Sequence, residues 1–145
     1  MTDALPSVLA AVNAPAHCDD EQPWMQVLRL ALPRVLPVKL FRQQTGRHKV
    51  ERGGIVQGAP VGAADLTGYV VGVGLRIEIE CKYGDGERKT DKKRLEAQRR
   101  WLAVCAADGC IALMLTYDDR CSTLLNVQAA VDALRAALLA RGVGA

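Results

Sequence analysis

The residues from Leu75 to Lys82 alternate between apolar and polar side chains without exception. Alternation with a period of two predicts a β-strand, because successive side chains of a strand point to opposite faces of the sheet. One face of the predicted strand is apolar, and the other carries Arg76, Glu78, Glu80 and Lys82. This polar face therefore ends in two acids and a lysine, the residue types that metal-dependent phosphodiester chemistry uses.

A second strand is predicted upstream, at residues 63–71, with Gly72-Val73 as a two-residue turn between the strands. Glycine suits the first central position of a type II′ turn, since it accepts a positive φ. The turn sets the register, and Leu66 then lies opposite Ile79 on a continuous apolar face. A slip of one residue would turn that apolar set to the other side of the sheet.

In this register Asp65 lies directly opposite Glu80 on the polar face. Opposed residues have Cβ atoms roughly 4.5–5.5 Å apart, so both carboxylates could hold one ion. Carboxylates, waters and a main-chain carbonyl are the oxygen ligands that Mg²⁺ or Mn²⁺ prefers. Lys82, on the same face, could orient or help deprotonate a water, or offset charge on a phosphoryl oxygen. The alternative is an exposed hairpin face whose charges serve solubility.

Around these residues the chain resembles the PD-(D/E)XK nuclease superfamily, and more narrowly the stand-alone VRR-NUC proteins of bacteriophages. Those proteins are similar to Holliday-junction resolvases in fold. The chain departs from the family pattern in two places. Ala64 stands where the family has a proline, and the strand at residues 111–115 lacks the family's Val-Arg-Arg signature. The matching segments follow the family order along the chain: Glu21 at a helix start, residues 40–46, residues 62–68, residues 79–82, and Gln98 on a later helix.

The resemblance implies an α/β fold, a mixed central β-sheet with flanking helices and a restriction-endonuclease-like core. It also implies a metal-dependent DNA endonuclease, using Mg²⁺ or Mn²⁺, directed to branched or junction DNA and active as a homodimer. Lys82 would be the catalytic lysine, and Gln98 the supporting glutamine. The implied metal ligands are Asp65, Glu80, the main-chain carbonyl of Cys81 and, at the helix start, Glu21.

Gln98 falls within a helix predicted from about residue 90 to residue 107 and closed by Gly109. It lies on the apolar stripe of that helix, where a glutamine is expected to be hydrogen-bonded. This position fits a side chain that reaches into the metal site, and the alternative is a glutamine at the edge of the stripe in water. The stripe itself is formed by Leu95, Leu102, Cys105 and Ala106.

Seven of the nineteen basic residues fall between residues 88 and 100, at the start of the same helix. A glycine-rich segment at residues 46–62 carries further basic residues. We expect contacts with the DNA backbone from both regions, although a solvated helix face and an ordinary surface loop are the alternatives. Aromatic residues suited to stacking are scarce, which favours recognition of backbone and shape. The expected DNA-binding residues are Arg88, Lys89, Lys92, Lys93, Arg47 and Lys49.

The remaining patterns complete an α/β layout of helix, strand, hairpin, helix, strand and helix. A first helix starts at residues 20–23 and ends by Pro33, and a strand or extended connection covers residues 35–42. The apolar run at residues 111–117 is expected at the centre of a sheet covered on both faces. Asn126 is expected to cap the last helix. Residues 1–20 are expected to be a loosely ordered segment before a single nuclease-like domain at residues 21–145.

Composition adds limits to this interpretation. A net charge of +3 permits nucleic acid as a partner without requiring it. Five cysteines without a CxxC pair support neither a disulfide framework nor a zinc knuckle. The sequence shows no long uninterrupted apolar run and no secretory signal, so a cytoplasmic location is expected. Two other functions stay open: a non-catalytic DNA-binding or recombination-accessory protein, and an enzyme acting on another phosphoryl substrate such as RNA.

Overall fold

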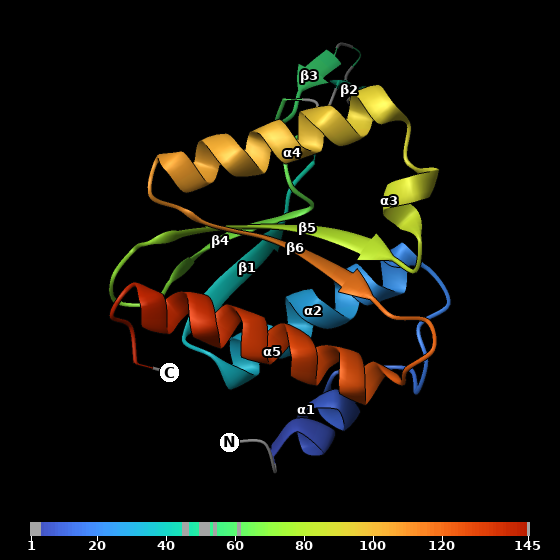
Figure 1. The fold of residues 1–145 in the computed structure, drawn as a ribbon, viewed down its shortest axis with the longest axis vertical. Coiled ribbons are helices and arrows are strands. Elements are labelled where there is room, and N and C mark those ends of the chain that lie inside the picture. The colour runs from blue at the N-terminus through green and yellow to red at the C-terminus, as the bar shows by residue number, and fades with distance from the viewer. Residues whose placement is uncertain (1–3, 45–46, 50–52, 54, 61, 145) are drawn as a thin grey trace.

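A four-stranded mixed sheet with helices on both faces forms the centre of the fold (Figure 1). The computed structural model describes the chain except residues 1–3, 45–46, 50–52, 54, 61 and 145, and the side chains at 47–49, 55–57, 87 and 89. In spatial order, the first two pairs of neighbouring strands are antiparallel, and the last pair is parallel. This confirms the predicted α/β class with a mixed sheet. The strand order is β1 (Val38–Arg42), β4 (Leu66–Val70), β5 (Arg76–Tyr83) and β6 (Ile111–Tyr117).

The helices lie in two layers (Figure 1). One face of the sheet packs against α2 (Glu21–Val35) and α5 (Thr123–Ala140), and α1 (Leu5–Ala11) packs against these two helices. The other face is covered by α4 (Lys92–Ala107), which the short helix α3 (Gly86–Lys89) connects to β5. Between β1 and β4, a small antiparallel pair is formed by β2 (Arg47–Lys49) and β3 (Ile55–Gln57).

The register between β4 and β5 is the predicted one, with Leu66 opposite Ile79. The prediction of a two-residue turn is wrong, because the connection between β4 and β5 is longer. The Val70 N–H donates to the carbonyl of Leu75, and residues 71–74 form the loop between them. Positive φ angles of 83° at Gly72 and 74° at Gly74 allow this wider loop. The register is preserved because the pairing set by the apolar face is unchanged.

The main core lies between the apolar face of the sheet and helices α2 and α5, and α1 extends it from the far side of these helices. Ile77, Ile79 and Cys81 point into it from β5 and are fully buried. The Trp24 indole donates a 3.1 Å hydrogen bond to a carbonyl of β6 and packs edge-on against Tyr117, with ring centroids 5.1 Å apart. Apolar area removed from water on this side is the principal source of stability.

The expectation that the first twenty residues are loosely attached is wrong for most of the described part. Leu5 and Leu9 are buried in the core, because their spacing places both on one face of α1. Cys18 is also buried, and its backbone N–H donates to the Tyr117 hydroxyl over 3.0 Å. The segment is therefore part of the packed fold.

Strand β6 is an edge strand among the described residues, pairing only with β5, so the predicted central position is wrong. Its apolar sequence reflects contact with α4 on one face and α5 on the other. By length and composition α5 could cross a membrane, but such a test is also passed by core helices. Since Val127, Leu134 and Leu138 of α5 are buried in the core, the packing fits a soluble protein.

One helix boundary differs from the prediction, because α2 continues to Val35 with Pro33 inside its last turn, where a missing N–H removes a single hydrogen bond. The helix predicted from about residue 90 to residue 107 is α4, and the short helix α3 before it was not predicted. Only Cys105 of the four predicted stripe residues is buried. Gly109 follows α4 with a φ of 98°, which agrees with its predicted role after the helix end.

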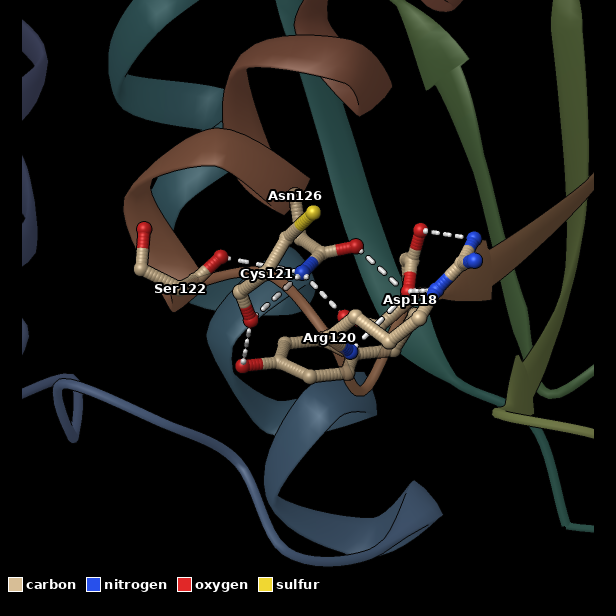
Figure 2. A network of polar contacts seen from close by, with 6 residues as sticks. Asp118, Arg120, Cys121, Ser122 and Asn126 are labelled. Carbon is tan, nitrogen blue, oxygen red and sulfur yellow. Dashed lines mark hydrogen bonds and ion pairs between the residues drawn. The ribbon is translucent and has the colours of Figure 1, made fainter.

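Asn126 is buried in the first turn of α5 and does not cap it. The capping residue is Ser122, whose hydroxyl accepts a hydrogen bond from the N–H of residue 125. Figure 2 shows that the Asn126 amide instead binds the connection after β6, including the backbone N–H and carbonyl of Asp118. Hydrogen bonds from Arg120 lower the pKa of the Asp118 carboxyl group to about 2.

Candidate functional site

The polar face of β5 is buried beneath α4. Glu78, Glu80 and Lys82 are only 0%, 2% and 3% exposed, respectively. Charged side chains are rarely buried unless they are paired or serve a site, because burial removes their hydration. This degree of burial excludes the alternative of an exposed hairpin face whose charges serve solubility.

The Asp65 side chain takes the place of a main-chain acceptor in one hydrogen bond between the β4 and β5 chains. Main-chain hydrogen bonds in an antiparallel pair fall on alternate residue pairs. Val70 and Leu75 form one such pair, so counting by twos along the strands leads to Ala64 and Cys81. There, the Cys81 N–H donates instead to Asp65 Oδ2, over 2.8 Å. The Asp65 carboxylate is therefore fixed beside the residue that separates Glu80 from Lys82.

The same geometry gives a direction to the Cys81 carbonyl. The N–H and C=O of one strand residue point to the same edge of the strand. Because the N–H of Cys81 meets Asp65, its carbonyl is also directed to the Asp65 side of β5. This orientation fits the expected third metal ligand.

Lys82 lies between an acid and a hydroxyl. Its Nζ is 3.8 Å from Glu80 Oε1 and donates a 3.1 Å hydrogen bond to Thr90 Oγ1. Thr90 follows α3, and its own hydroxyl donates to the carbonyl of Gly86. Two anchors therefore hold the ammonium group in one place. No sequence pattern pointed to Thr90, since its role depends on how α3 folds back toward β5.

Burial and like charge perturb the acids of the site. Burial, followed by the charge of Asp65, raises the pKa of Glu80 to about 8, although Lys82 opposes the shift. Burial and then Asp65 also raise the pKa of Glu21, which Lys82 and Arg94 oppose. The Asp65 charge acts on both Glu21 and Glu80, and such an effect requires proximity, so the fold brings the three acids to one region.

Three buried oxygen atoms on this side of the sheet have no hydrogen-bond partner among the described residues: Glu78 Oε2, Glu80 Oε2 and Gln98 Oε1. Such atoms are costly in a folded protein unless something binds them. A divalent cation would satisfy the Glu80 carboxylate, so the donor set fits the expected metal. Gln98 is only 5% exposed, which excludes the alternative of a glutamine in water at the edge of the helix.

The metal site that these residues could form would contain few carboxylate ligands. Within the described ranges, no group of three or more His, Cys, Asp or Glu side chains is close enough to hold a metal ion. Asp65 and Glu80 would therefore need oxygen ligands from the backbone and from water, as Mg²⁺ commonly uses. Glu21, at the N-terminus of α2, lies near enough to influence the site electrostatically, which leaves its expected role as a ligand a hypothesis.

Two hollows open beside these residues, and Arg94 lines both. One, of about 380 Å³, is also lined by Glu21, Lys82 and Thr90. The other, of about 410 Å³, is lined by Asp65 and by residues of α2 and of the segment after β1. Arg94 was not among the expected site residues, although it lies one helical turn before Gln98 within the basic run.

Glu78 connects three elements around the site. Its Oε1 accepts hydrogen bonds of 2.9 Å from Trp101 Nε1, 3.1 Å from Arg76 Nη2 and 3.5 Å from Gln43 Nε2. Gln43 also donates to the carbonyl of Ala64 over 3.0 Å. The buried carboxylate thereby joins β5 to α4 and to the end of β1, which positions the helix that carries Gln98.

The structure describes the side chains of three of the six expected DNA-binding residues. Lys92 and Lys93 are exposed at the start of α4. Arg88 is also exposed, but it lines a separate hollow of about 900 Å³ together with Asp118, Asp119 and Arg120. The side chains of the remaining three expected residues lie outside the described part of the chain: Arg47, Lys49 and Lys89.

Comparisons with protein-family models, curated proteins and solved structures find no match for this chain. A functional conclusion therefore depends on the geometry of the residues around Asp65, Glu80 and Lys82. The resemblance to PD-(D/E)XK nucleases remains a hypothesis based on the motifs along the sequence.

Proposed function

We propose that this protein is a metal-dependent nuclease that hydrolyses phosphodiester bonds in DNA through a site of the PD-(D/E)XK type. One observation carries the proposal. The Asp65 carboxylate is bonded to the amide between two buried charged side chains, Glu80 and Lys82, and Glu80 keeps an oxygen without a hydrogen-bond partner among the described residues. A buried group of this kind is costly for folding, so a functional role explains its presence better than a structural one.

Asp65, Glu80 and the Cys81 carbonyl are the residues that would hold the metal ion, with Glu21 as a further candidate. When bound, Mg²⁺ or Mn²⁺ supplies Lewis-acid chemistry, polarising a phosphoryl oxygen and lowering the pKa of water. The high pKa of Glu80 means that a proton competes with the metal for this carboxylate below about pH 8.

Lys82 and Gln98 are the proposed positioning and proton-handling groups. The Lys82 ammonium, held by Glu80 and Thr90, is placed to orient a water for attack on phosphorus or to stabilise charge on a phosphoryl oxygen. Gln98 presents its amide oxygen from α4, where it can accept a hydrogen bond from that water. Arg94 lines both hollows at the site, and a guanidinium there can bind a phosphate oxygen.

The finer parts of the proposal follow from the resemblance. They are a restriction-endonuclease-like core, branched or junction DNA as substrate, and a homodimer with two centres for two strands. Exposed basic residues at the start of α4, including Lys92 and Lys93, support a polyanionic partner. The cytoplasmic location stays an expectation from the sequence.

A cleavage assay tests the function. Purified protein is incubated with four-way-junction, flap, linear-duplex and RNA substrates in Mn²⁺, Mg²⁺ or EDTA. Glu80→Gln and Lys82→Met each preserve side-chain size and are expected to lose at least about 100-fold in cleavage rate, the usual scale for such groups. Arg29→Ala is the matched control, since Arg29 lies partly exposed on α2 and its guanidinium donates to the side chain of Gln26.

The outcomes separate the candidate functions. Full cleavage by both site variants, or cleavage in EDTA, would rule out the proposed mechanism. DNA binding without cleavage in any metal would favour a non-catalytic accessory protein. Preferential cleavage of RNA would replace the proposed substrate.

A further inference from the structure

An aromatic pair is exposed on the sheet near the proposed active site. Phe41 of β1 and Tyr69 of β4 are 53% and 42% exposed. Their ring centroids are 6.4 Å apart, with 32° between the ring planes. Helix α4 packs over β5 and β6, whereas these rings extend from the neighbouring strands. Large exposed aromatic rings that are adjacent to each other are characteristic of binding surfaces.

The pair shares a sheet face with the proposed site. Phe41 is paired with Thr67, and Asp65, Thr67 and Tyr69 alternate along one chain, so their side chains point to one side. Tyr69 lies four residues from Asp65, which corresponds to about 13 Å along a strand. Tyr69 is paired in turn with Arg76, the residue that binds Glu78. The aromatic surface is therefore continuous with the buried charged face.

Basic side chains flank the rings. Lys39 is paired with Tyr69 across β1 and β4, and Arg76 is paired with Tyr69 from the other side, across β4 and β5. Both basic residues are exposed. Flat apolar surfaces between cations complement a polyanion that carries planar rings, and a single nucleic-acid strand has that chemistry.

The core gives no reason for the exposure of this pair. Trp24 and Tyr83 pack against Tyr117 on the opposite face, with ring centroids 5.1 Å and 5.2 Å from it. Phe41 is the only phenylalanine in the chain and stands outside that cluster. A ring with this exposure adds little to the burial of apolar area.

We propose that Phe41 and Tyr69 stack with unpaired bases of a DNA strand whose backbone passes into the site at Asp65 and Glu80. The proposal rests on the nuclease function and specifies its substrate as DNA with a single-stranded segment beside the cleaved bond. It revises the expectation from composition that stacking plays little part, because two rings suffice when they lie together at the site.

Binding measurements test the stacking surface directly. Fluorescence anisotropy is recorded with labelled (dT)12, (rU)12 and a blunt duplex, in the Glu80→Gln background so that no strand is cut. Phe41→Ala and Tyr69→Ala are each expected to weaken (dT)12 binding about 10-fold while changing duplex binding less than about 2-fold. Tyr69→Phe keeps the ring and is expected to keep the affinity. Leu139→Ala, at a 58% exposed position on α5, is the matched control.

Any of three results would overturn the proposal. They are equal weakening of duplex and (dT)12 binding by the ring substitutions, no weakening of either, and no (dT)12 binding by the Glu80→Gln protein itself. Tighter binding of (rU)12 than of (dT)12 would overturn the assignment to DNA. Thermal unfolding confirms that the variants are folded. The parent function is tested separately: if Glu80→Gln still cuts DNA while the ring variants lose (dT)12 binding, the nuclease mechanism fails and the stacking surface stands.

Discussion

The Oδ2 atom of Asp65 accepts a 2.8 Å hydrogen bond from the backbone N–H of Cys81. Asp65 lies just outside β4, which begins at Leu66, and on the β1 side its carbonyl accepts a 2.8 Å hydrogen bond from the Gln43 N–H. On the β5 side the Asp65 side chain makes the bond, and it thereby approaches the two charged neighbours of Cys81. The bond between these two residues thus joins the fold of the hairpin to the chemistry of the site.

Two variants of Asp65 separate its charge from its hydrogen bond. Asp65→Asn and Asp65→Ala both remove the carboxylate, but only asparagine retains an oxygen that can accept from Cys81. We expect Asp65→Ala to be less stable than Asp65→Asn by about 1–2 kcal/mol, as measured by urea unfolding. Both variants are expected to lose Mn²⁺ binding in calorimetric titration. Equal stabilities of the two variants would show that the bond to Cys81 contributes nothing.

The raised pKa of Glu80 predicts a specific pH dependence of stability. The carboxyl titrates with a pKa of about 8 in the folded protein and at its ordinary value of 4.5 when exposed. The folded state therefore holds the proton more tightly. This tighter proton binding contributes to the free energy of unfolding. The contribution is complete below about pH 4.5, decreases as the pH rises, and is lost above about pH 8. Without added metal, Glu80 becomes increasingly destabilising across this range.

Glu80→Gln provides the reference for that measurement, because glutamine resembles the neutral acid at every pH. The free energy of unfolding of the wild type, relative to Glu80→Gln, is expected to fall between about pH 5 and pH 8 and then to level off. Mn²⁺ at high pH is expected to raise the melting temperature of the wild type and not that of the variant. A constant difference across this pH range would contradict the assigned pKa.

Trp101→Phe removes the indole N–H that donates to Glu78 Oε1 over 2.9 Å. Because the carboxylate is completely buried, the loss is expected to cost about 1–3 kcal/mol of unfolding free energy. Glu78→Gln supplies the second edge of a double-mutant cycle. The tryptophan substitution is expected to cost less in that background, because a neutral amide needs donors less than a carboxylate does. Additive effects would indicate that the two side chains are not coupled.

Gly62→Ala is expected to disturb the contact between the segment before Asp65 and helix α4. A Cβ atom at Gly62 would lie 2.8 Å from main-chain atoms of Ala97, and the φ of Gly62 is 94°. Gly72→Ala is the matched control, since Gly72 has a φ of 83° but a Cβ atom there would meet no described atom within 4 Å. We expect Gly62→Ala to be less stable than Gly72→Ala by about 1–3 kcal/mol in chemical unfolding. Equal losses would mean that backbone strain alone matters.

The hairpin could be predicted from sequence because its two faces differ so clearly in polarity. With a period of two, only one register keeps Leu66 opposite Ile79 and leaves Asp65 on the polar side. The predicted register is confirmed even though the loop is longer. The edge position of β6 could not be predicted, because a strand covered by helices on both faces is apolar wherever it lies in the sheet.

The remaining site residues depend on tertiary structure. Thr90 reaches Lys82 only because α3 interrupts the chain between β5 and α4. Arg94 lines both hollows because of the direction in which α4 starts. The sequence shows only that Arg94 belongs to a run of basic residues, and not which of them face the site. The burial of Leu5 was missed because α1 is short, and its few apolar residues give a weak helical pattern.

The two faces of β5 contribute differently to the stability of the protein. The apolar face, packed against the α2 and α5 layer, stabilises the fold, whereas the charged face under α4 costs free energy to bury. Under the proposed nuclease function, a lineage that replaced Glu80 and Lys82 by neutral residues would lose activity without losing its scaffold. The proposed function therefore implies that folded, inactive relatives are an accessible evolutionary product, and that selection for activity preserves the buried charges.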